Sequence, residues 1–187
     1  MRDAELTPEL LAFIREQKDR QEIHDCLMRY ARGVDRHDRE LMASAYHPDA
    51  YDKHGIAEGG VGEFCDWAIG MHGATQTGHQ HIINNHSVEI DGDVAHAETY
   101  FSFWGENREG PPLMAFGRYI DRFEKRDGRW AIAYRVCMTE QTGHFIPTNY
   151  PEEVRRKSAS TGPCTRDKGD LSYVRPLGPE AVVPRAG

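Results

Sequence analysis

The sequence lacks the features that mark membrane, secreted and disulfide-rich proteins. It has no run of apolar residues near the roughly 20 that a helix needs to span a bilayer. Its N-terminal segment has no apolar core of a secretory signal. Its four cysteines are scattered singly, without a C-x-x-C pair, which is typical of reduced thiols. These absences predict a cytoplasmic protein with no membrane partner.

The sequence also has fewer basic than acidic residues and lacks recognisable cofactor motifs. The chain has 23 Lys and Arg against 30 Asp and Glu, and its formal net charge is -7. Because nucleic-acid-binding domains normally present a basic face, the balance argues against nucleic acid as a partner. Phosphate-cradling glycine motifs, a G-x-S-x-G segment and a recognisable cysteine nucleophile are all absent. We therefore expect a small-molecule ligand and no organic cofactor.

What the chain does contain suits one domain with an appended tail. It has 187 residues, of which 39% are hydrophobic and 28% charged, so a packed core is expected. Thr7-Pro8 is a good helix start. A second helix is predicted over about 20–34, and Asp38 is predicted to cap a third that ends at His47-Pro48-Asp49. A further helix is predicted over 61–71.

From about residue 79 the hydrophobic pattern changes to that of strands. Long strands are predicted over 79–90, 94–107, 113–125 and 129–140, after a short one at 50–54. Asp91-Gly92-Asp93 and Asp127-Gly128 mark turns between them. Helices followed by long antiparallel strands predict an α+β fold. In it a curved antiparallel sheet wraps the N-terminal helices as a cone and encloses a pocket.

The composition changes again after Glu140. Six prolines punctuate a polar stretch in which only residues 151–158 have a helical pattern. We therefore expect an α+β catalytic domain over 1–140. Residues 141–187 are expected to form an extended tail that packs on the domain or a neighbouring subunit and ends in disorder.

Three residues in this arrangement suggest acid/base chemistry. Asp35 ends the second predicted helix, where a carboxylate opposes the helix dipole and needs another partner. His79 and His81 project to one face of the first long strand, whereas Gln80, Ile82 and His86 are expected on the other. An imidazolium would serve as the partner of Asp35.

The H-x-H spacing of His79 and His81 also fits a metal site. A catalytic metal needs about three protein ligands, and His96 on the next strand is the third candidate. Metal binding is the alternative here, but we expect no metal.

Other polar and aromatic residues are candidates for the pocket wall. Arg135 lies in the last strand on a face of small residues, where it could hold a leaving oxygen or instead form a surface ion pair. The aromatic candidates could equally serve in ordinary core packing. The expected substrate-binding residues are Tyr51, His79, Tyr100, Trp104 and Tyr119, and Trp67 is a further wall candidate.

Residues 20–140 resemble the SnoaL-like branch of the nuclear transport factor 2-like superfamily. The matching features, in order, are Tyr30-x4-Asp35, His81-x3-Asn85, Arg118-Tyr119-x-Asp121-x-Phe123 and Asp127-Gly128-x-Trp130. Within the superfamily the chain is most similar to cofactor-free lyases. These are scytalone dehydratase, bile acid 7α-dehydratase, hexachlorocyclohexane dehydrochlorinase and a diarylpropane lyase that expels formaldehyde.

The resemblance implies specific roles for these residues. It makes Asp35 and His81 the catalytic pair and Tyr30 and Arg135 their helpers. It implies a homo-oligomer, either a trimer or a dimer. The expected function is elimination, either dehydration or retro-aldol loss of a fragment such as formaldehyde, from an apolar aromatic or polycyclic hydroxylated substrate. The alternatives are an isomerase or cyclase with the same pocket, a ligand carrier, or a protein like the small subunit of an oxygenase.

Overall fold

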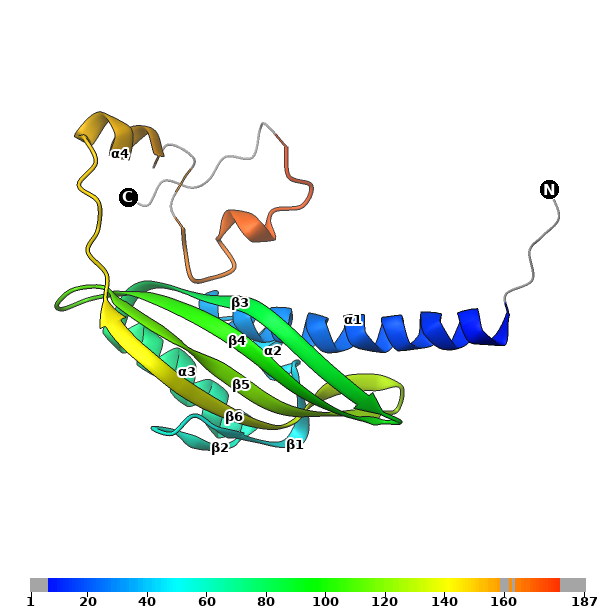
Figure 1. The fold of residues 1–187 in the computed structure, drawn as a ribbon. Helices are drawn as coiled ribbons and strands as arrows, with labels where there is room; N and C mark the ends of the chain where they lie inside the picture. The colour runs from blue at the N-terminus through cyan, green and yellow to red at the C-terminus, as the bar shows by residue number, and fades with distance from the viewer. Residues whose placement is uncertain (1–6, 159–161, 163, 179–187) are drawn as a thin grey trace.

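The structure, a computed structural model, describes residues 7–158, 162 and 164–178 (Figure 1). One long helix, α1 (Pro8–Asp35), opens it, with Thr7 accepting a hydrogen bond from the Leu10 amide and proline in the first turn. The prediction of two separate helices here was wrong. The intervening residues 15–19 are charged or amide residues that favour helix, and Arg20 pairs with Glu16 one turn away at 2.7 Å.

Asp38 caps the short helix α2 (Arg39–Ala43), as predicted, by accepting a hydrogen bond from the Leu41 amide. This helix does not continue to Pro48, because β1 (Tyr46–Lys53) already begins at Tyr46. Proline is tolerated there because it lies within an irregularity of the pairing between β1 and its neighbour. The short strand β2 (Glu58–Gly60), which was not predicted, then leads into α3 (Val61–Thr75).

Four long strands follow, close to their predicted bounds: β3 (Gln76–Asp91), β4 (Val94–Asn107), β5 (Leu113–Arg126) and β6 (Arg129–His144). They pair antiparallel in sequence order and form an open six-stranded sheet with the order β2-β1-β6-β5-β4-β3. The α+β prediction is confirmed. The sheet is mixed rather than purely antiparallel, because β1 runs parallel to β6.

The helices α1, α2 and α3 lie against one face of the curved sheet (Figure 1). Ile23, Leu27 and Val34 from α1 pack with Phe64 of α3 and with inward residues of the strands to form the buried core. The first turns of α1 extend beyond the sheet, and Leu10 and Phe13 are exposed there. The core therefore joins the second half of α1 to the sheet and leaves a site between the sheet and α3.

Part of the C-terminal segment contacts the domain. The helix α4 (Glu152–Ser158) has no buried residue, but Lys168 and Tyr173 both bind the Asp38 carboxylate. Tyr173 belongs to a short 3-10 helix (Leu171–Tyr173). The division into a domain over 1–140 and a tail stays a prediction, as does the homo-oligomer. The expected disordered end lies mostly outside the described residues. No helix among the described residues is long and apolar enough to cross a membrane.

Gly33 allows α1 and α2 to approach closely. A Cβ atom at this position would lie 2.4 Å from the backbone nitrogen of Met42. We therefore expect Gly33→Ala to lower the free energy of unfolding by about 1–3 kcal/mol, measured by chemical denaturation. The matched control is Gly70→Ala in α3, where nothing lies within 4 Å of the added carbon. Alanine should stabilise the helix there by up to about 1 kcal/mol. Equal effects of the two changes would contradict this account.

Candidate active site

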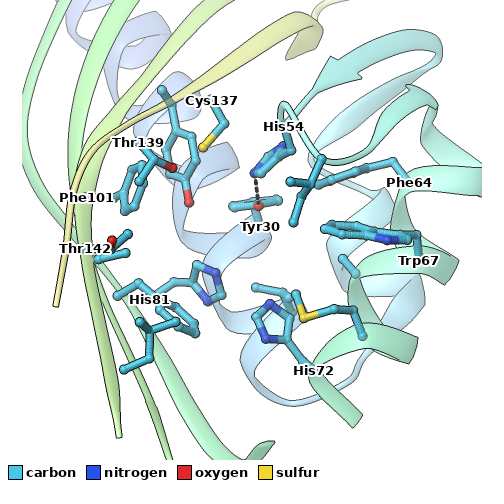
Figure 2. Close-up of a pocket in the computed structure, with 18 residues that line it drawn as sticks. Tyr30, His54, Phe64, Trp67, His72, His81, Phe101, Cys137, Thr139 and Thr142 are labelled. Atoms are coloured by element: carbon cyan, nitrogen blue, oxygen red, sulfur yellow. Dashed lines mark hydrogen bonds between the residues drawn. The ribbon is translucent and has the colours of Figure 1, made fainter. Parts of the chain in front are cut away.

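A cavity of about 260 Å³ lies between the inner face of the sheet and α3 (Figure 2). Its wall is mostly apolar: Val34, Ile56, Phe64, Trp67, Ala68, Met71, Phe101, Phe103, Leu113 and Ala115. The remaining lining residues carry polar or thiol groups: Tyr30, His54, His72, His81, Tyr119, Cys137, Thr139 and Thr142. Such a wall suits a small, largely apolar ligand with a few polar groups to orient it.

The structure brings Asp35 and His81 together at this cavity. Asp35 is the last residue of α1, and His81 lies on β3. Nδ1 of His81 is 2.7 Å from Oδ1 of Asp35, and the His81 backbone amide donates to both carboxylate oxygens at 3.1 and 2.9 Å. These donors satisfy a carboxylate that the helix C-terminus disfavours. The pair is therefore held by backbone as well as side-chain contacts.

This contact also fixes which nitrogen of His81 is free to react. A carboxylate only accepts hydrogen bonds, so Nδ1 of His81 carries the proton. Among the described residues, no hydrogen-bond partner is found for Nε2 of His81. A neutral imidazole held in this way presents its lone pair on Nε2 and can act as a base, while Asp35 stabilises the imidazolium that forms.

Two further histidines pack beside this pair. The rings of His72 and His79 stack with their centroids 4.2 Å apart. Burial, reinforced by the neighbouring imidazoles, lowers the pKa of His72 to about 4 and that of His79 to about 2. Both are therefore neutral near pH 7. His72 lines the cavity, whereas His79, expected to bind substrate, lies behind it and is almost fully buried.

If a metal binds here, its third protein ligand would be Asp35 and not His96. Ligand atoms of Asp35, His79 and His81 lie within 4.8 Å of one another, so these three could hold an ion. His96 cannot join them, because it lies on the outer face of β4. Nε2 of His79, which is 3.6 Å from Asp35, also contacts the Val34 carbonyl oxygen at 3.2 Å. Since a carbonyl only accepts, this nitrogen carries a proton and would have to be freed to bind a metal.

Arg135 lies deeper than the sequence suggested. It points to the inner side of β6 but does not line the cavity, and its side chain has no exposed surface. Its Nε and Nη2 atoms each donate to the Asp121 carboxylate at 2.7 Å. The guanidinium carbon lies 4.4 Å from the Tyr30 ring centroid and 4.1 Å from that of Tyr119. These two rings separate Arg135 from the cavity, so it cannot hold a leaving oxygen directly.

Some of the aromatic candidates line the cavity and others face away from it. Tyr30, Trp67 and Tyr119 line the cavity. Tyr100 and Trp104 do not, because even-numbered residues of β4 face outward while Phe101 and Phe103 face inward. Tyr51 is on the outer side of β1, where its ring stacks on Tyr134 at 6.2 Å. The expectation that these three bind substrate within this cavity is not supported by their positions.

An irregularity in β3 shows that the expected position of His86, on the face opposite to His81, was wrong. The register shifts between Ile83 and His86. This shift turns His86 to the inner face, where Nδ1 contacts the Thr99 hydroxyl at 2.9 Å. An extra residue in one strand reverses the alternation beyond it, which a strict two-residue period does not anticipate.

Sequence reasoning missed His54 and its partner Asp52. His54 follows the last residue of β1 and lines the cavity, and its Nδ1 contacts Oδ1 of the buried Asp52. Its Nε2 lies 3.4 Å from the Tyr30 hydroxyl (dashed in Figure 2). An Asp-x-His spacing at the end of a strand, where alternate residues share a face, was the signal available in the sequence.

Comparisons with known proteins agree with this architecture. A family model described as a SnoaL-like domain matches residues 15–136. No curated protein matches the chain. Among solved structures, a candidate scytalone dehydratase from Novosphingobium aromaticivorans is similar at 18% identity and TM-score 0.63, over 71% of this chain and 91% of that one.

Two hexachlorocyclohexane dehydrochlorinases are also similar. The type 2 LinA enzyme has 20% identity and TM-score 0.68, over 74% of this chain and 96% of that one. The type 3 LinA enzyme from Novosphingobium barchaimii has 20% identity and TM-score 0.63, over 72% of this chain and 99% of that one. At these identities the likeness establishes a shared fold.

Proposed function

Because the chain belongs to the SnoaL-like domain family, we propose that it is a cofactor-independent lyase. Its reaction is elimination from an apolar aromatic or polycyclic hydroxylated substrate, either by dehydration or by retro-aldol loss of a fragment such as formaldehyde. The observation that carries the proposal is the Asp35–His81 contact of 2.7 Å at the wall of an apolar cavity. The named functions of the dehydratase and dehydrochlorinase relatives support the same reaction class.

In the dehydration reaction, Nε2 of His81 removes a proton from carbon. The electrons of that C–H bond form the new double bond, and the neighbouring C–O bond breaks so that the oxygen leaves with a proton as water. In the retro-aldol variant, His81 takes a hydroxyl proton instead, and the O–H electrons form the carbonyl double bond of the released aldehyde. The electrons of the broken C–C bond stay on the other carbon, which takes the proton back from His81. A positioned base of this kind contributes about 10²–10⁴-fold to the rate.

Tyr30 is the group best placed to assist the departing oxygen. Its hydroxyl lies at the cavity, and its ring meets the His81 ring edge-on at a centroid distance of 6.2 Å. Burial raises the pKa of Tyr30 well above its ordinary value, despite the opposing charge of Arg135. The phenol therefore stays protonated and can donate a hydrogen bond to the oxygen as charge develops on it.

The cavity wall supports the proposed substrate class. Phe64 and Trp67 stack on one side, with ring centroids 6.1 Å apart, and Phe101 stacks with Tyr119 on the other at 4.6 Å. Flat aromatic walls favour a flat apolar ligand. No Lys or Arg lines the described cavity to bind an anionic group. A neutral aromatic alcohol satisfies both conditions.

Product analysis in heavy water tests the proposal. A panel of neutral aromatic and polycyclic alcohols with an acidic C–H beside the hydroxyl is incubated with the protein, and products are identified by mass spectrometry. Loss of water or of formaldehyde supports a lyase. Deuterium uptake without loss of mass would instead support an isomerase that shares the same base. His96→Gln, on the outer face of β4, should behave as wild type. A panel that neither binds nor turns over would count against the proposal.

A further inference from the structure

A second carboxylate–imidazole pair lies across the cavity from Asp35 and His81. Asp52 of β1 has no exposed surface, and both of its oxygens have partners. The Tyr46 hydroxyl donates to Oδ2 at 2.6 Å, and Nδ1 of His54 contacts Oδ1. Since the carboxylate only accepts, Nδ1 of His54 carries a proton. Nε2 of His54 is left to face Tyr30, 3.4 Å from its hydroxyl.

This second pair reaches the first through Tyr30. Figure 2 shows the Tyr30 hydroxyl between His54 and His81. The His54 ring is held by stacking on Phe64, with centroids 4.6 Å apart, and both histidines line the cavity. Two imidazoles, each fixed at Nδ1 by an aspartate, therefore approach one cavity from opposite walls.

The two imidazoles have different electrostatic surroundings. Around His54, the described charged and titratable neighbours are Asp52 and Tyr46 of β1, Tyr30 of α1, Tyr119 of β5, and Arg135, Cys137 and Asp121 nearby. Asp121 already binds Arg135 with both oxygens, so this ion pair is neutral. Among the described residues, the His54 ring is then the nitrogen-bearing side chain in contact with the buried Asp52 carboxylate.

The charged and titratable neighbours of His81 are different. Besides Asp35, its neighbours include the uncharged rings of His72 and His79. Beyond these rings lies the guanidinium of Arg166, whose Nη1 is 3.0 Å from the His72 carbonyl oxygen and 3.5 Å from Nδ1 of His79. Beyond the stacked rings, the charge on the His81 side of the cavity is therefore that of a guanidinium. The two imidazoles also differ in what they face: Nε2 of His54 contacts the Tyr30 hydroxyl, whereas His81 lines the cavity with Nδ1 held by Asp35.

We propose that Asp52, His54 and Tyr30 form a proton-donating arm that serves the departing oxygen. The proposal rests on the proposed lyase function. When His54 is neutral, its Nε2 accepts the Tyr30 proton, and Tyr30 offers only lone pairs to the cavity. When His54 is protonated, Nε2 donates to Tyr30, which turns the Tyr30 O–H toward the ligand. The charge on His54 therefore decides whether Tyr30 can donate.

The complete step balances within the two arms. His81 takes the proton from carbon, the C–H electrons form the double bond, and the C–O electrons leave on oxygen. Tyr30 gives its proton to that oxygen and receives the Nε2 proton of His54 in exchange. The products are an alkene and water, with His81 protonated and His54 neutral. Return of the proton from His81 to His54 through solvent restores the starting state.

Ring-opening elimination of benzisoxazoles tests the arm without the natural substrate. In this reaction a base removes the C3 proton, the N–O bond breaks, and a phenolate leaves to give a cyanophenol. Ring substituents change the acidity of the leaving phenol while the proton that is removed stays the same. A base alone suffices for the most acidic phenols, whereas the least acidic ones benefit from proton donation.

We expect His54→Gln and Asp52→Asn to leave the most activated member, 5-nitrobenzisoxazole, within a few-fold of the wild-type rate. The same changes should slow the least acidic leaving group by about 10²-fold. Tyr30→Phe removes only the hydroxyl at the end of the arm and leaves the Asp52–His54 contact in place, so it should give the same leaving-group dependence even if the other variants fold poorly. His96→Gln is the matched control.

The outcomes separate the two proposals. If His54→Gln and Tyr30→Phe slow every member equally, or none, the proton-donating arm is overturned while the base remains. If His81→Gln leaves all rates unchanged, or the wild type does not accelerate even 5-nitrobenzisoxazole, the cavity has no working base. In that case the lyase function fails, and the arm fails with it.

Discussion

Replacing His81 with glutamine is expected to reduce turnover about 10²–10⁴-fold, the range for loss of one positioned acid/base group. Glutamine cannot take up a proton in place of Nε2. The fold should tolerate the change, because the backbone amide of His81, which donates to both oxygens of Asp35, is retained. The measurements are kcat and kcat/KM, with the free energy of unfolding determined in parallel.

Asp35→Asn should cause a loss of similar size for a different reason. The amide NH₂ group can donate to Nδ1 of His81, which reverses the contact that now holds the proton on that nitrogen. The proton then moves to Nε2, and the lone pair is lost from the cavity side. His96→Gln should retain full activity. Wild-type turnover in both dyad variants would sink the catalytic role of this pair.

The largest expected effect on stability comes from Arg135. Arg135→Met should lower the free energy of unfolding by about 3–5 kcal/mol, because it leaves the Asp121 carboxylate buried without its cation. Burial already raises the pKa of Asp121 despite the presence of Arg135. Without Arg135 the folded state gains more from protonating Asp121 than the unfolded chain does. The destabilisation should therefore shrink as the pH is lowered.

The double variant Arg135→Met/Asp121→Leu provides the control. It removes both charges and fills the space with apolar side chains, so it should recover most of the stability lost in the single variant. Urea denaturation of the wild type and of the two single and one double variants gives the coupling between the residues. A double variant as unstable as Arg135→Met would show that the guanidinium acts mainly through the Tyr30 and Tyr119 rings.

The sequence alone predicted the parts of this molecule that depend on local signals. The Thr7 and Asp38 caps and the turns at Asp91-Gly92 and Asp127-Gly128 depend on neighbouring residues, and they place two helix starts and the strand meander. The nearness of Asp35 and His81 was also predictable. A carboxylate at a helix C-terminus needs a partner, and the family resemblance supplied His81.

Features that depend on distant contacts could not be predicted in this way. Arg135 was expected on an inward face of β6, and it does lie inward, but its depth depends on Asp121 of β5 and on two tyrosine rings. The strict alternation behind that expectation is broken between Ile132 and Tyr134, so Trp130 and Ile132 also join the core. The position of His54 depends on β1 pairing parallel with β6, which follows about 80 residues later in the chain. No local pattern near residue 54 encodes that pairing.

Burial of the stacked rings of His72 and His79 lowers their pKa values, so the folded chain binds fewer protons beside its proposed base than the unfolded chain does. Their pKa values of about 4 and about 2 lie below the ordinary value of 6.5, so below about pH 6.5 the unfolded chain binds protons that the native state refuses. Unfolding then becomes coupled to proton uptake, and stability falls as the medium is acidified. Mild acid therefore destabilises the fold through two histidines that are packed beside the proposed base and are distinct from it.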